Sequence, residues 1–81
     1  MSKYIYTESM GNQAFYIVED DRELLWFVWL DKYGIANIFE SMEALASYLA
    51  GDLTCDRYCI EPYDTGNEGV DFIDHHFKIG V

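Results

Sequence analysis

Hydrophobic and polar positions along the first forty residues follow the two-residue period of β-strands. Four segments rich in aromatic and β-branched residues predict strands at 3–9, 13–19, 24–30 and 35–39. Short polar breaks separate these segments, and Gly11 and Gly34 supply the left-handed backbone that tight turns use. Connections this short favour antiparallel hairpins.

The period then changes to that of a helix in "SMEALASYLAG", residues 41–51. Its apolar residues recur at i, i+3, i+4 and i+7 and form one amphipathic stripe, which consists of Met42, Leu45, Ala46 and Leu49. Ser41 is a favoured N-cap, Glu43 suits the positive end of a helix, and Gly51 is a favoured residue just beyond a helix end.

Two more strands are expected after the helix, one at 57–63 and one within 70–80, with a loop at 64–69 between them. Pro62 cannot donate to a strand ladder, so it belongs at an edge or a strand end. The predicted order is β-β-β-β-α-β-β. The chain 1–81 is therefore expected to form a single α+β domain, with one antiparallel sheet of about five to six strands and one helix packed on one face.

The segment "LLWFVWL", residues 24–30, is apolar on both faces of its predicted strand. A strand with one wet face normally alternates apolar and polar residues, and one helix covers only one face. The other face needs the C-terminal segment and sheet curvature, a second copy in a homodimer, or a different protein to cover it. Its large rings make Trp26, Phe27 and Trp29 candidate residues of an apolar interface.

Composition favours a folded, acidic protein. Apolar residues make up 51% and aromatic residues 17% of the chain, and fifteen acidic against five basic residues give a net charge of −10. Nucleic acids and anionic membranes attract cationic surfaces, so neither is expected as a direct partner. The charge favours association with a basic protein, and it is equally compatible with a role in solubility alone.

The predicted topology gathers acidic residues at one end of the sheet, called the near end, which carries turn 20–23. The helix begins there, and loop 64–69 returns to it. The predicted partner-binding acids at this end are Glu19, Asp20, Asp21, Glu23, Glu40, Glu43, Asp64 and Glu68.

Targeting signals are not evident in the sequence. Residues 1–7 lack the long apolar core of a secretory signal, and the longest apolar run is far below the ~20 residues that a membrane helix needs. A cytoplasmic location is therefore expected, and there the two cysteines remain thiols.

Candidate chemistry is sparse. Cys55 and Cys59 are spaced too widely along a strand for a disulfide and lack the tight pairing of zinc sites. His75 and His76 would point to opposite faces of a strand. No nucleophile elbow, phosphate loop or dinucleotide motif occurs. We expect no enzymatic activity, no cofactor and no metal; the alternative is a small metal-dependent enzyme that uses Cys59, His75 or His76.

The length, the −10 charge and "IFESMEALASYLAG" after a strand meander resemble the layout of small, acidic, phage-encoded inhibitors of host defence, including anti-CRISPR proteins. The resemblance implies an inhibitor that mimics DNA in the host cytoplasm. It would block a CRISPR effector, a nuclease or a DNA-binding protein through acidic residues anchored by aromatic ones. The alternative is a homodimeric, acidic accessory protein without nucleic-acid mimicry.

Overall fold

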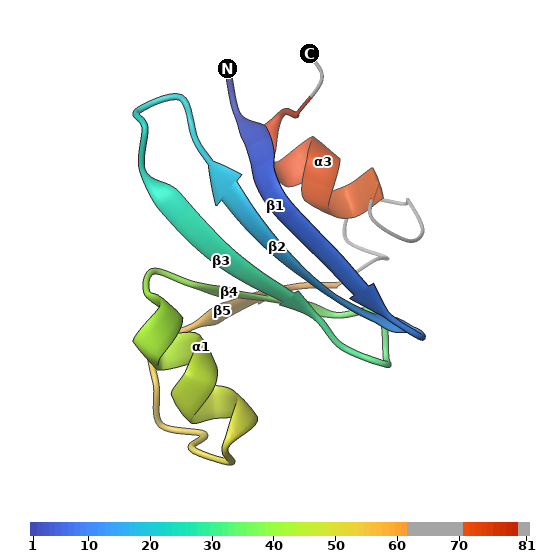
Figure 1. Ribbon diagram of the computed structural model, residues 1–81, viewed down its shortest axis with the longest axis vertical. Coiled ribbons are helices and arrows are strands. Elements are labelled where there is room, and N and C mark those ends of the chain that lie inside the picture. The colour runs from blue at the N-terminus through green and yellow to red at the C-terminus, as the bar shows by residue number, and fades with distance from the viewer. Residues whose placement is uncertain (62–70, 80–81) are drawn as a thin grey trace.

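The computed structural model describes residues 1–61 and 71–79 and contains one antiparallel sheet with the strand order β1-β2-β3-β4-β5. Within these residues, helices α1 and α3 accompany the sheet (Figure 1). The elements are β1 (Lys3–Met10), β2 (Gln13–Glu19), β3 (Leu25–Leu30), β4 (Ala36–Phe39), α1 (Met42–Leu49), β5 (Tyr58–Ile60) and α3 (Asp71–Phe77). The predicted α+β class with a single antiparallel sheet is confirmed.

The turns between β2 and β3 and between β3 and β4 use the same hydrogen bonds. Asp20 and Asp31 each begin a turn, and the Oδ1 atom of each accepts from the backbone N–H groups two and four residues further on. The third residue after each aspartate has a left-handed backbone, Glu23 with φ 64° and Gly34 with φ 79°. The predicted hairpins are confirmed, although the β2–β3 turn places Glu23 in a backbone conformation that glycine adopts without steric cost.

Helix α1 begins and ends as its sequence predicts. The Ser41 hydroxyl accepts from the backbone N–H of Ala44 at 3.1 Å, which satisfies one free donor at the helix start. Gly51 has a φ of 103°, and its N–H donates to the carbonyl of Tyr48 at 3.0 Å. The N-cap and the glycine beyond the C-terminus are both confirmed.

The C-terminal element is a helix, and the prediction of a strand within 70–80 was wrong. Phe72, Ile73 and Phe77 are all buried, and their spacing places them on one side of a helix. A strand would have sent the adjacent Phe72 and Ile73 to opposite faces. Residues 62 and 63 of the other predicted strand, with Pro62, and loop 64–69 lie outside the described residues.

The two helices lie on opposite sides of the sheet (Figure 1). On the α3 side the core consists of Ala14, Tyr16, Val18, Val28, Leu30, Ala36, Ile38, Ile60, Phe72, Ile73 and Phe77. On the α1 side a smaller core consists of Trp29, Phe39 and Leu45. Helix α1 packs on one face, as expected, and a second helix, α3, covers the other face. Cover by the C-terminal segment was one of the three possibilities that the sequence left open.

Candidate protein-binding surface

Helix α1 covers its side of the sheet only in part. A row of paired residues crosses the sheet on this side, from Phe39 on β4 through Phe27 and Ile17 to Tyr6 on β1. Phe39 is fully buried, Phe27 and Ile17 are half-buried, and Tyr6 is 46% exposed. Since α1 packs against β3 and β4, the apolar side chains of β1 and β2 extend beyond the area that it covers.

The apolar stripe of α1 is also partly uncovered. Only Leu45 of the four predicted stripe residues is buried, whereas Met42 is 47% and Leu49 is 52% exposed. The helix contacts the sheet through Leu45, with Ala44 and Tyr48 half-buried beside it. The predicted stripe is therefore only partly buried, because it extends toward the side of β1 and β2, where no described element faces it.

Two hollows follow the boundary between α1 and the sheet. The first has a volume of about 220 Å³ and is lined by Glu8, Met10, Phe15, Trp29, Met42, Leu45, Ala46 and Leu49. The second has a volume of about 430 Å³ and is lined by Leu24, Leu25, Trp26, Phe27, Glu40, Ser41 and Met42. Met42 borders both, so the two hollows are neighbours along one continuous surface.

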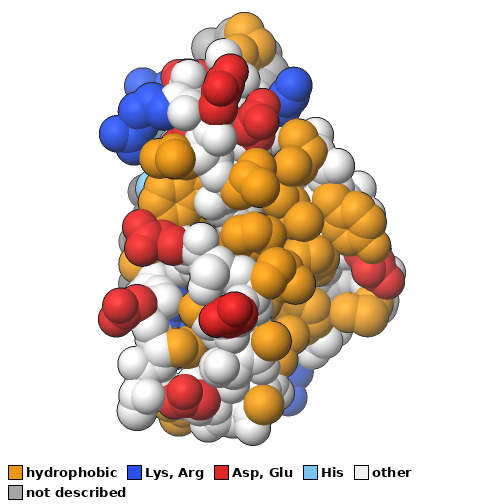
Figure 2. All heavy atoms as spheres, turned by 60° about the vertical axis from the view of Figure 1, so that its left-hand side comes forward, with side chains coloured by type: hydrophobic (Ala, Val, Ile, Leu, Met, Phe, Trp, Pro, Cys, Tyr) orange, Lys and Arg blue, Asp and Glu red, His pale blue; other side chains and the backbone are white. Residues whose placement is uncertain are grey.

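This surface is named the open face. Its sheet residues are Tyr6, Glu8, Met10, Phe15, Ile17, Leu25 and Phe27, and its helix residues are Met42, Ala46 and Leu49. Figure 2 shows hydrophobic side chains as an extended patch in this region, with acidic side chains at its margin. Contiguous exposed apolar surface of this kind is typical of protein interfaces.

Carboxylates border the open face. Glu8 lines the first hollow and Glu40 the second, while Glu43 lies in the first turn of α1. Glu19 pairs across the sheet with Leu25 and forms an ion pair with Lys3, with 3.6 Å between Nζ and Oε1. An apolar centre with acidic margins therefore extends from the β2–β3 turn to the far part of β1.

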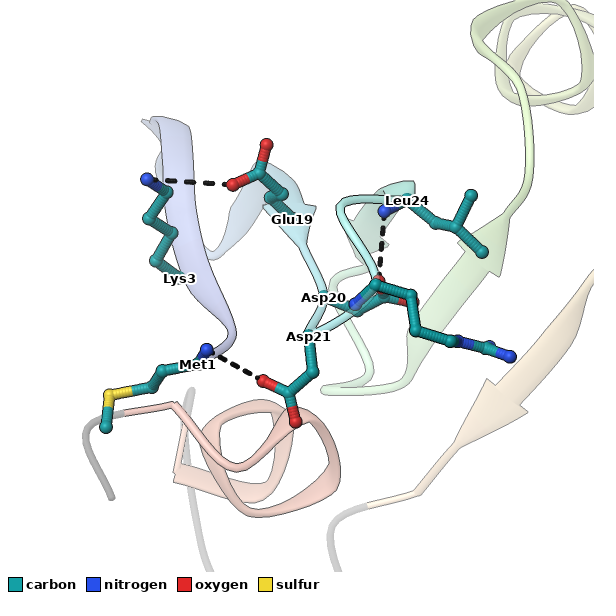
Figure 3. A network of polar contacts seen from close by, with 7 residues as sticks. Met1, Lys3, Glu19, Asp20, Asp21 and Leu24 are labelled. Carbon is teal, nitrogen blue, oxygen red and sulfur yellow. Dashed lines mark hydrogen bonds and ion pairs between the residues drawn. The ribbon is translucent and has the colours of Figure 1, made fainter.

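The acidic residues of the near end make different polar contacts (Figure 3). The carboxylate of Asp20 accepts from Trp26 Nε1 at 2.8 Å and from the backbone N–H of Leu24 at 3.0 Å. These hydrogen bonds, that of Trp26 foremost, lower the pKa of Asp20 below its usual value. Asp20 therefore stabilises its turn and orients the indole ring, and it is a poor choice for a partner contact.

Asp21 and Glu23 are exposed at the β2–β3 turn, and Glu40 and Glu43 are exposed at the start of α1. Asp21 forms an ion pair with the N-terminal ammonium group of Met1 at 3.0 Å, and Glu23 occupies the left-handed turn position. The start of α1 does meet this end, since Glu40 and Leu24 line the same hollow. Asp64 and Glu68 lie outside the described residues.

The three aromatic candidates have unequal exposure. Trp29 is buried beneath α1, and Trp26 is half-buried on the α3 side against the rings of Tyr58 and Phe77. Phe27 alone belongs to the open face. The apolar residues that sequence reasoning missed as interface candidates are Tyr6, Met10, Leu25, Met42 and Leu49; their hydrophobic pattern is the same whether the residue is buried or exposed, so only the packing identifies them.

The cysteine and histidine candidates do not converge. Cys59 is on the α1 side, where its Sγ atom lies 2.8 Å from Arg57 Nη1. His76 lies on α3, on the opposite side of the sheet. Both cysteines are free thiols, as predicted. Within residues 1–61 and 71–79, no group of three or more His, Cys, Asp or Glu side chains is placed to hold a metal ion.

The Tyr58 hydroxyl and His76 Nε2 are 3.1 Å apart and join β5 to α3. Burial, with a smaller contribution from Glu40, raises the pKa of Tyr58. Burial, with a smaller contribution from the neighbouring His75, lowers the pKa of His76. At neutral pH the phenol is therefore protonated and the imidazole uncharged, so the pair is a neutral hydrogen bond between two elements.

Comparison of the chain with protein-family models, with curated proteins and with solved structures found no match. No helix among the described residues has the length and apolar character needed to cross a bilayer.

Proposed function

We propose that this protein is a binding protein that docks a basic, nucleic-acid-handling partner on the open face and thereby inhibits it. The observation that carries the proposal is the uncovered apolar surface over β1 and β2, with Glu8, Glu40 and Glu43 in it or beside it. Neither feature has an evident role in the fold of the described chain, and together they suit a partner that is apolar at its centre and cationic around it.

The apolar part of the open face supplies affinity. Fully burying a Leu, Met or Phe side chain contributes about 1.5–3 kcal/mol, and Met10, Leu25, Met42 and Leu49 are each 42–52% exposed. Residues at the centre of an interface that lose all their water provide most of the binding energy. Leaving these side chains in water has no benefit for the isolated chain.

The acidic part supplies rate and selectivity. A net charge of −10 accelerates the approach of a cationic protein and repels anionic competitors. Carboxylates that occupy Lys and Arg sites also exclude phosphates from those sites. The inhibition proposed here is this competition, as the resemblance to phage-encoded inhibitors of CRISPR effectors, nucleases and DNA-binding proteins implies.

The test is affinity capture from cells that produce the protein, followed by reconstitution. The tagged wild type is compared with a variant in which Met10→Gln and Leu49→Gln remove apolar anchors without changing charge. Leu53→Gln is the matched control, because Leu53 is 73% exposed and lies outside the open face. We expect the wild type and the control, but not the double variant, to retain a basic protein that elutes near ~0.5 M salt.

The purified partner then decides the functional claim. We expect the wild type to reduce binding or cleavage of nucleic acid by that partner in proportion to complex formation, and the double variant to have no such effect. A captured partner whose nucleic-acid activity is unchanged in the complex would exclude the inhibitory function. A partner retained equally by all three proteins would exclude the open face as its docking site.

A further inference from the structure

The open face has a floor and a wall. The floor is the surface of β1 and β2, where Tyr6, Phe15 and Ile17 share one side of the two strands. The wall is the side of α1 that carries Met42 and Leu49, each about half exposed. Because the hollow of about 220 Å³ is lined by residues from both, a segment that fills it contacts floor and wall together.

The floor has the width of one helix. Neighbouring strands lie about 4.8 Å apart, so two strands give a floor of about 10 Å, and a helix with its side chains is ~10–12 Å in diameter. Helices packed side by side have axes ~8–10 Å apart. A helix above β1 and β2 would therefore complete the layer that α1 begins above β3 and β4.

The floor also has the length of a medium helix. Strand β1 contains eight residues, which at about 3.4 Å each extend ~27 Å. A helix rises 1.5 Å per residue, so ~18 residues match that length. Strand β1 is interrupted by a register shift between Tyr4 and Tyr6 and carries Lys3 at its start, and both features discourage the addition of a further strand at this edge.

The charge of the open face favours a helix of another protein over a second copy of this chain as its ligand. Glu8 and Glu40 line the two hollows, and Glu43 lies on α1 next to Met42. A second copy would bring the same carboxylates to the same surface, and each copy carries a charge of −10. A segment with Lys or Arg beside its apolar stripe would pair with these groups.

We propose that the open face binds an amphipathic helix of about 14–18 residues that lies beside α1 across β1 and β2. Its apolar side fills the hollow at Phe15 and Met42, and its flanking Lys or Arg residues meet Glu8 and Glu43. This inference rests on the proposed function, because it specifies the chemical class of segment through which a basic partner docks.

The test uses three labelled peptides of about 18 residues. The first places Leu and Lys at the helical period, the second has the same composition in strict alternation, and the third replaces each Lys of the first by Glu. We expect the first peptide to bind at least about tenfold more tightly than either of the others, a difference of ~1.4 kcal/mol or more. Binding is measured by fluorescence anisotropy, and backbone amide shifts locate the site.

Variants connect the binding to the open face. We expect the double variant with Met10→Gln and Leu49→Gln to bind the first peptide at least about tenfold more weakly than the wild type. The control Leu53→Gln should change its affinity less than about twofold. Amide shifts are expected along β1, β2 and α1. Unchanged thermal unfolding of the double variant shows that the loss is in binding and not in folding.

Three results would overturn the inference. The alternating peptide could bind as tightly as the helical one, the shifts could centre on α3, or sedimentation could show a dimer that Met10→Gln and Leu49→Gln dissociate. The proposed function fails separately, when a captured partner keeps its nucleic-acid activity in the complex. A partner that is inhibited but binds the open face through a strand or a loop would support the proposed function. It would contradict only the proposal that the bound segment is a helix.

Discussion

Both sides of the sheet carry large apolar residues, but they differ in how completely a helix covers them. On the α3 side, Val18, Val28 and Ile38 are all buried from β2 to β4. On the α1 side, burial falls from Phe39, which is fully enclosed, to Tyr6, which is 46% exposed. One side is thus a closed core, whereas the other is a core that ends halfway across the sheet.

This difference separates the side of the sheet that stabilises the fold from the side on which we propose that a partner docks. A domain of this size buries a limited share of its surface and needs one well-packed core to fold. The α3 side provides that core, with Phe72 and Ile73 enclosed by the sheet. The α1 side can then leave apolar surface uncovered, because the fold does not depend on closing it.

The largest expected effect is on the closed side. Replacing Phe72, which is fully buried, by alanine removes a ring from the core beneath α3. We expect Phe72→Ala to lower the free energy of unfolding by about 3–5 kcal/mol, measured by urea denaturation with circular dichroism. A loss below about 1 kcal/mol would show that α3 does not close this side in solution.

The next largest effect is a gradient, across the α1 side, in the unfolding free energy lost when an aromatic ring is replaced by alanine. We expect Phe39→Ala to cost about 3–5 kcal/mol and Tyr6→Ala to cost less than about 1 kcal/mol, because one ring is enclosed and the other faces water. Phe27→Ala should lie between them. The measurement is the same denaturation series. Equal losses at Tyr6 and Phe39 would contradict partial coverage by α1.

A smaller effect concerns the β2–β3 turn, which both sides of the sheet share. Glu23 has a φ of 64° where the equivalent position of the next turn is Gly34. We expect Glu23→Gly to stabilise the protein by about 0.5–1 kcal/mol through relief of backbone strain. Thermal and urea unfolding measure this change.

The same variant also tests whether Glu23 contacts a partner. We expect Glu23→Gly to change binding at the open face by less than about twofold, since an isolated exposed charge contributes little. Binding that falls about tenfold in a more stable protein would make Glu23 part of the contact, as its place among the near-end acids predicts.

The smallest effect is the acid response of the turn at Asp20. Its pKa is lowered in the fold, first by the hydrogen bond from Trp26, so the folded protein binds fewer protons than the unfolded chain. Stability therefore rises with pH, and this contribution is lost as pH falls below the ordinary value of about 3.9 and through the lowered pKa. We expect Asp20→Asn to reduce the dependence of the unfolding midpoint on pH below about 4.

An unchanged pH profile in Asp20→Asn would mean that other carboxylates set the acid response. Trp26 fluorescence provides a second readout, because its indole donates to Asp20 on the α3 side. The matched variant is Asp31→Asn, since Asp31 forms the equivalent turn without a tryptophan partner among the described hydrogen bonds.

Most local structure could be predicted from the sequence. The hairpin turns, the N-cap Ser41 and the glycine at 51 depend on hydrogen bonds between residues a few positions apart, so their chemistry is readable in the order of the residues. The C-terminal segment was predicted wrongly because three apolar residues, Phe72, Ile73 and Phe77, are too few to distinguish a helical period from a strand period. A short apolar run fits a strand or a helix, and contact with the sheet decided between them.

The candidate surface could be predicted only in outline. The run at 24–30 indicated that both sides of the sheet are apolar, and the charge of −10 favoured a basic protein as the proposed partner. The predicted residues of the apolar contact are Trp26, Phe27 and Trp29, and two of these pack mainly within the protein. The size and hydrophobicity of a residue indicate that it will be buried. They do not indicate whether the protein itself or a partner buries it.

The sequence by itself determined the four strands before α1, the turns between them and helix α1, and that the sheet is apolar on two sides. These properties depend on local backbone geometry and residue periodicity. Only the tertiary structure decided that the C-terminal helix closes one side and that α1 lies over β3 and β4, leaving β1 and β2 open. The reason is that burial depends on which element lies opposite a side chain, and that element is distant in the sequence.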